Sequence, residues 1–229
     1  MKKTVYLAIM GIVLGTAPAQ AELLIGWDGG TVGNSATNVT GVSGSLFANS
    51  AYAVDATAGS TDGTFGSSFT GADTATTAYA VRLYDSPNND RIGVQIYNQT
   101  GSDIQLDSLV FDFGRWYADA PQDVIVTYAY GDLADANNTA ITTITGIAVT
   151  GKAADYTDLS VSLSGLTDTI LADGQKATFN LIASNAAGIY NNGAFDNVGV
   201  VGTVIPEPAT LGLITLIAAG LFGIRRITM

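Results

Sequence analysis

Short runs in which hydrophobic and polar residues alternate cover most of the chain between residues 77 and 204. In 91–97, for example, the apolar side chains are Ile92, Val94 and Ile96. Side chains two residues apart point to the same face of a strand, so each run predicts a strand with one buried face. The predicted strands are 23–27, 77–84, 91–97, 104–113, 124–130, 140–149, 159–163, 177–183 and 195–204.

The segments between these runs are rich in Gly, Asn and Asp, as turns require, for example 85–90, 98–101 and 131–138. No window has the apolar stripe of a helix, so no crossover helices exist to join parallel strands. We therefore expect one all-β domain, an antiparallel β-sandwich of jelly-roll type with about nine to eleven strands. The Gly-, Ser-, Thr- and Ala-rich segment 28–75 is expected to hold short edge strands and long loops.

The chain begins with the pattern of a secretory signal peptide at 1–21. Lys2 and Lys3 form a basic start, an apolar stretch follows, and Ala19 and Ala21 form a small-x-small cleavage site. The apolar stretch is too short to span a bilayer stably. We expect signal peptidase to cleave after Ala21, which leaves 22–204 as the exported domain.

The last segment, 205–229, has a different pattern. Residues 209–224 carry no charge and only two hydroxyl side chains, and Arg225 and Arg226 follow them. As a helix this run would be roughly 24 Å long, a short transmembrane span whose terminal arginines reach the headgroups. Arginines beside a span stay in the cytoplasm, so the domain is expected outside and the last residues inside. A buried C-terminal core helix is the alternative, but it would have a polar face.

Pro206, Glu207 and Pro208 stand just before this span, and both prolines disfavour helix there. The motif, the apolar span and the basic end together resemble the tripartite PEP-CTERM sorting signal of Gram-negative bacteria. The resemblance implies that exosortase, a membrane-embedded cysteine enzyme, recognises the tail and cleaves near the motif. It also implies a transient stay in the inner membrane and then release to the cell surface or matrix, often with exopolysaccharide.

Composition limits the function of the domain. The whole chain has a net charge of −11, and without its two ends, which carry four of the nine basic residues and one of the twenty acidic ones, the domain has −14. Such a surface repels nucleic acid. The chain has no Cys and no His, which excludes disulfides, imidazole–zinc sites and Ser-His-Asp or Cys-His catalysis. We predict no enzymatic activity and no resident cofactor.

Three generic strand features look like the jelly-roll domains found before such sorting tails and in carbohydrate-binding modules. They are the strand 106–113, the Asp173-Gly174 turn before Thr178, and the closing strand 195–202. Within this region, Arg115, Trp116 and Tyr117 follow a strand in a predicted loop and form a candidate ligand platform. An exposed ring there would stack on a sugar face, but Trp116 could equally cover the open end of the core.

Two other groups of residues could form a functional site or could have only a structural role. The loops 85–90 and 131–138 contain Asp and Asn that could ligate calcium or simply form turns. Asp107 and Asp112 could be a hydrolytic pair, but their spacing of five in a strand predicts opposite faces. In 23–206 there is no Glu to serve as the usual acid.

The sequence therefore predicts an exported, exosortase-processed protein with a structural or interaction role in the envelope or exopolysaccharide. A carbohydrate-binding module is the alternative, and a glycan-active enzyme is a third, weaker hypothesis.

Overall fold

The computed structural model describes residues 20–28, 37–48, 52–55, 59–70, 72, 78–82, 91–152, 154–188 and 192–206. Every regular element in these residues is a β-strand, and they contain no helix able to span a membrane. The strands are β1 (Glu22–Trp27), β2 (Thr37–Asn38), β3 (Val42–Ala48), β4 (Tyr52–Asp55), β5 (Thr64–Phe65), β6 (Phe69–Thr70), β7 (Ala78–Arg82), β8 (Arg91–Asn98), β9 (Ile104–Arg115), β10 (Asp123–Gly131), β11 (Thr139–Ile144), β12 (Thr157–Ser162), β13 (Ile170–Leu171), β14 (Lys176–Ser184) and β15 (Asn192–Val204).

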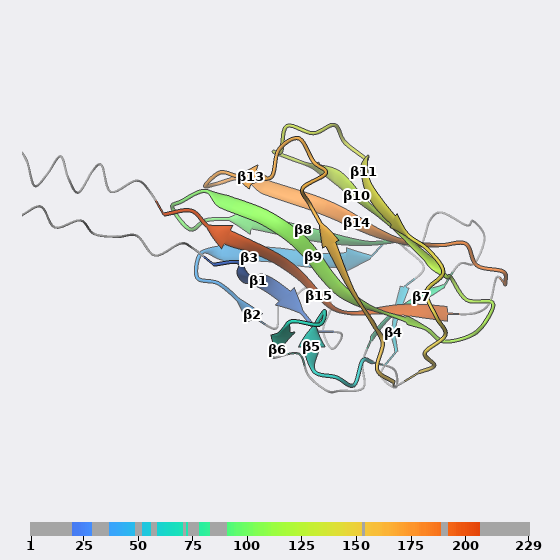
Figure 1. The fold of residues 1–229 in the computed structure, drawn as a ribbon. Coiled ribbons are helices and arrows are strands. Elements are labelled where there is room, and N and C mark those ends of the chain that lie inside the picture. The colour runs from blue at the N-terminus through green and yellow to red at the C-terminus, as the bar shows by residue number, and fades with distance from the viewer. Residues whose placement is uncertain are drawn as a thin grey trace, which may run out of the picture.

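Two antiparallel sheets form the sandwich (Figure 1). The larger, eight-stranded sheet runs β12-β9-β15-β1-β2, with β13 paired to β9 and with β7 and β4 extending from β15. The five-stranded sheet runs β11-β10-β14-β8-β3. All strand ladders described are antiparallel, which confirms the prediction of an all-β, antiparallel sandwich.

The core lies between these sheets and is built from the alternating apolar residues of their inner faces. Phe195 of β15 contacts the rings of Phe111 and Phe113 in β9, at centroid distances of 5.8 and 4.9 Å. In the other sheet Tyr128 and Phe179 are edge to face at 5.9 Å. Because these side chains are fully buried, they contribute the large apolar area that a chain without disulfides needs.

A second, smaller apolar cluster lies on the outer face of the eight-stranded sheet. The hairpin formed by β5 and β6 covers Val110 of β9 and Val201 of β15 with the buried ring of Phe65. This explains why β9 is buried on both faces over residues 109–114, although an outer strand face is usually polar. Residues 59–70, which contain this hairpin, therefore cover the middle of the sheet, and we call them the flap.

The structure differs from the predicted strands in several places. The strand expected at 140–149 ends at Ile144, since Gly146 adopts φ 70° and donates its amide to Asp123 Oδ1 at 2.9 Å. The segment 28–75 holds short strands, as expected, but also β3, a seven-residue edge strand. The two-residue strands were too short to be predicted from alternation.

The described chain enters and leaves the sandwich at the same end (Figure 1). Glu22, at the start of β1, pairs with Gly202, near the end of β15. β15 continues to Val204, so the folded core ends two residues before Pro206. The predicted signal peptide, apart from Gln20 and Ala21, and the predicted span at 209–224 lie outside the described residues.

Candidate functional site

Two residues of the predicted ligand platform, Trp116 and Tyr117, follow β9 in a loop as expected, but Arg115 is the last residue of β9 itself. Of the three platform side chains only Tyr117 is well exposed, at 46%, whereas Trp116 is 4% exposed. The Trp116 ring packs with Tyr156 and Ala194, and its Nε1 donates to the Tyr156 hydroxyl at 2.8 Å. Trp116 is therefore buried, as the alternative interpretation of this residue proposed, but in a small apolar cluster separate from the main core, and it does not offer an open stacking face.

The side chain of Arg115 forms hydrogen bonds with nearby backbone carbonyl groups. Its guanidinium donates to the carbonyl of Ile147 at 3.0 Å and to the carbonyl of Ala118. Lys152 lies over the Trp116 ring, with its Nζ 4.5 Å from the ring centroid, a cation–π contact. The cations here therefore hold loops together, and the geometry gives Arg115 a structural role.

The Asp-rich loop 131–138 uses its carboxylates to hold backbone amides. Asp132 accepts from the Lys176 amide at 2.9 Å, and Asp135 accepts from the amides of Thr167 and Asp168, each at 3.0 Å. These two hydrogen bonds lower the pKa of Asp135. The turn interpretation therefore accounts for this loop, while the residues 85–90 lie outside the described part.

A polar hollow of about 500 Å³ lies on the outer face of the five-stranded sheet. Strands β3, β8 and β14 form its floor, and the loops that carry Asp132 and Gly174 form its edge. Its lining residues are Ser43, Gly44, Ser45, Gln95, Tyr97, Asp132, Gly174 and Lys176. The lining combines hydroxyl, amide, carboxylate and ammonium groups with one aromatic ring, which is a set suited to a polyhydroxylated ligand.

Other exposed aromatic side chains belong to the same sheet. Phe47 of β3 is 38% exposed and Tyr130 of β10 is 44% exposed. Phe47 pairs in register with Gly93 of β8, and a Cβ at Gly93 would lie 2.3 Å from its ring. Glycine at this position therefore lets the Phe47 ring lie flat across the strand, as an open apolar surface.

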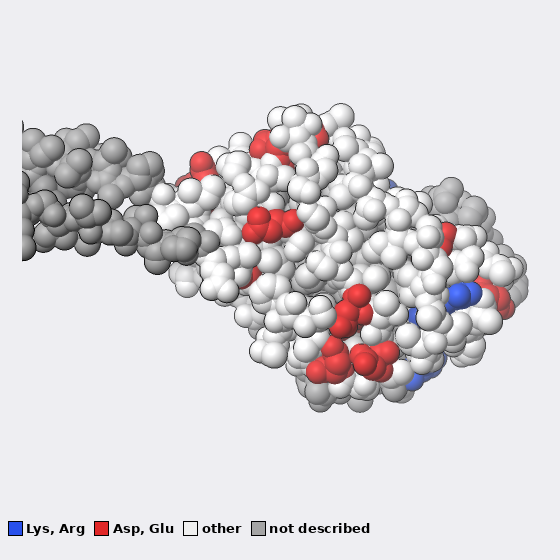
Figure 2. All heavy atoms as spheres, in the orientation of Figure 1, with Lys and Arg blue, Asp and Glu red and all other residues white. Residues whose placement is uncertain are grey.

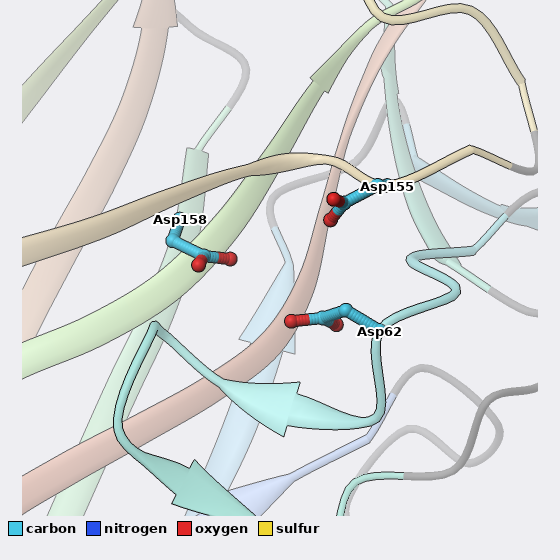
Figure 3. A group of neighbouring side chains, drawn as sticks. All are labelled: Asp62, Asp155 and Asp158. Atoms are coloured by element: carbon cyan, nitrogen blue, oxygen red, sulfur yellow. The ribbon is translucent and has the colours of Figure 1, made fainter.

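Acidic side chains gather on the outer face of the opposite, eight-stranded sheet (Figure 2). Asp62, from the loop before β5, lies beside Asp155, from the loop before β12, and Asp158, from the start of β12. Carboxylate oxygens of all three lie within 4.8 Å of one another (Figure 3). We call these three residues the aspartate cluster. Desolvation, and then the charges of Asp62 and Asp155, raise the pKa of Asp158.

Asp112 of β9 lies next to the aspartate cluster but is fully buried. It pairs in register with Asp158 on one side and with Asp196 of β15 on the other. Its Oδ2 accepts from Asn197 Nδ2 at 2.7 Å, while its Oδ1 has no hydrogen-bond partner. Burial is the main cause that raises the pKa of Asp112 to about 8, and the nearby charges of Asp62 and Asp158 add to it.

This acidic group was not predicted, because its four residues come from three separate segments of the chain. Asp107, which the sequence already placed on the opposite face of the strand from Asp112, accepts a hydrogen bond from Thr203 at 3.3 Å. One signal was present in the sequence. Asp112 stands between Phe111 and Phe113 in a buried strand, where an acid is costly unless it is partnered.

No family model and no curated protein matches the chain. The solved structures similar to it include the CBM22-1 xylan-binding domain of Paenibacillus barcinonensis Xyn10C, with 10% identity and a TM-score of 0.41 over 83% of this chain and 100% of that chain. A Stig cyclase from Fischerella sp. TAU has 13% identity and a TM-score of 0.37, over 75% of this chain and 80% of that one.

A family two carbohydrate esterase from Cellvibrio japonicus is a third similar structure, with 10% identity and a TM-score of 0.27 over 73% of this chain and 36% of that one. Identities and scores at this level carry no argument about activity or ligand. The functional argument therefore rests on the residues of this chain.

Proposed function

We propose that the protein is exported, processed at its C-terminal tail by an exosortase, and displayed at the cell surface or in the extracellular matrix. The sandwich has a structural or interaction role there, and no catalytic one. The supporting observation is the position of Pro206, two residues after the last core strand ends at Val204. A motif at this position is separate from the core, so cleavage there would leave the fold intact.

Mass spectrometry of the protein recovered outside a Gram-negative host tests this proposal. With exosortase present, the recovered chain is expected to begin at Glu22 and to end near residues 206–208. The control is the same host without exosortase, in which the chain should stay in the membrane with Arg225 and Arg226 attached. Recovery of extracellular protein that still carries both arginines in the presence of exosortase would show that the tail is an ordinary anchor.

A second candidate function is carbohydrate binding, and the polar hollow on the five-stranded sheet favours it. Tyr97 would stack on the apolar face of a sugar ring, while Gln95 and Lys176 would bond to its hydroxyls. The extracellular location proposed above would bring polysaccharide to this face.

Retardation of the protein in gels containing bacterial or plant polysaccharides tests this candidate. Loss of one stacked ring costs on the order of 1–2 kcal/mol, so Tyr97→Ala should weaken binding about five- to thirtyfold. Tyr117→Ala, which removes an exposed ring from the other predicted site, is the matched control and should bind normally. Equal retardation of the wild type and Tyr97→Ala would remove the hollow from consideration and leave the structural role.

A further inference from the structure

Among the described residues, the charges that act on Asp158 of the aspartate cluster belong to the other two aspartates, Asp62 and Asp155. Like charges this close repel each other, and the buried carboxyl group of Asp112 lies next to them. Asp62 is partly stabilised, since it accepts hydrogen bonds from the hydroxyls of Ser60 and Thr64. Asp155 and Asp158 are exposed. A bound cation would relieve the repulsion between these carboxylates.

Two buried oxygen atoms beside the cluster are the independent sign of a ligand. Asp112 Oδ1 and Asn197 Oδ1 both lack a hydrogen-bond donor, although both residues are fully buried. An unpaired polar atom in the interior normally costs free energy, so such atoms are rare in folded proteins. Asp112 is the ladder partner of Asp158, so its carboxylate lies on the same side of the sheet as the aspartate cluster.

We propose that the aspartate cluster, together with Asp112, binds a calcium ion. The donors are all oxygens, and the chain has no His or Cys to favour a softer metal. Asp62 and Asp155 come from loops, which adapt to the irregular shell of Ca²⁺ more readily than to the strict octahedron of Mg²⁺. Extracellular modules commonly bind calcium with dissociation constants of about 10⁻⁴–10⁻³ M, and a site of this class rests on the export proposed above.

The position of the ion explains what it would do. Asp62 belongs to the flap that carries β5 and β6, Asp155 to the loop before β12, Asp158 to the start of β12, and Asp112 to the sheet itself. The same segments already touch through the isolated bridge between Ser60 and Ala154. Calcium would therefore join the flap to the sheet, in a chain that has no disulfide to do so.

Thermal unfolding of the full-length protein in mild detergent tests the proposal. After treatment with EDTA, CaCl₂ at a hundredfold excess over its Kd should raise the Tm by about 5–10 °C, and the same excess of MgCl₂ by much less. Asp158→Asn should abolish the calcium shift. Asp103→Asn makes the same charge change at an exposed aspartate outside the cluster, and it should keep the whole shift.

Three results would overturn the proposal. Calcium could leave the Tm of the wild type unchanged, or it could raise the Tm of Asp158→Asn as much as that of the wild type, which would place the ion elsewhere. Asp158→Asn could also stabilise the EDTA-treated protein while calcium has no effect on the wild type, which would indicate a proton shared with Asp112. If Asp158→Asn does not fold, Asp155→Asn, at an exposed loop residue, gives the same comparison.

Discussion

The most unusual single residue in the domain is Asp112, an acid in the middle of a buried strand. Its raised pKa means that between about pH 4 and pH 8 the folded protein keeps a proton on this carboxyl, which the unfolded chain has lost. The folded state then binds more protons than the unfolded state. Without calcium, the contribution of Asp112 to the free energy of unfolding is therefore largest at low pH and is lost as the pH rises towards 8.

This pH dependence can be measured by urea unfolding in EDTA at several pH values. The contribution of Asp112 has a slope of at most about 1.4 kcal/mol per pH unit, and it should disappear in Asp112→Asn. The difference between the two proteins isolates this residue from the other acids. Parallel curves for the wild type and the variant would contradict the assignment of a raised pKa to Asp112.

Glycine determines how closely the central strands approach. A Cβ at Gly202 of β15 would lie 2.3 Å from the backbone oxygen of Gln105 in β9 and 2.7 Å from Leu24 in β1. Both neighbours are paired strands, so neither can easily move away. Gly202→Ala should therefore lower the free energy of unfolding by about 1–3 kcal/mol.

Gly165→Ala is the matched control for this substitution, because a Cβ there would meet nothing within 4 Å. It should be neutral or slightly stabilising, since alanine restricts the unfolded chain. Denaturant unfolding of both variants decides the point. A small effect at Gly202 would mean that β15 and β9 can separate at this position without loss of the ladder.

The sequence predicted most long strands because one face of each is buried and alternation reveals it. It missed β3, where Ser43, Gly44 and Ser45 hide the two core residues Val42 and Leu46. The sequence around Trp116 did not determine whether its side chain is exposed, since a tryptophan in a loop can either bind a ligand or pack into the interior. Only the fold, which places Tyr156 against it, decides between them.

The aspartate cluster shows a different limit of prediction. Its members stand at positions 62, 155 and 158, and Asp112 and Asn197 join them from two further strands. Apart from Asp155 and Asp158, no local spacing in the sequence connects these residues. The antiparallel pairing of β12, β9 and β15 brings Asp158, Asp112 and Asn197 together. Sites of this kind depend on strand order, which alternation alone does not determine.

On the scale of the whole molecule, the two outer faces differ in chemistry. The five-stranded sheet carries the polar hollow and exposed rings, while the eight-stranded sheet carries the flap and the aspartate cluster. A ligand bound to the first face would leave the second free. Calcium and polysaccharide would then act at separate places on the domain, and the two experiments above test them independently.

The position of β15 has a mechanical consequence. This strand leads to the tail, and it is paired with β9 from Gly193 to Val204 and with β7 and β1 along its other edge. Antiparallel hydrogen bonds lie perpendicular to the strand, so a pull along it loads many of them at once in shear instead of opening them one by one. A membrane enzyme could therefore draw on the tail with considerable force before the sandwich came apart.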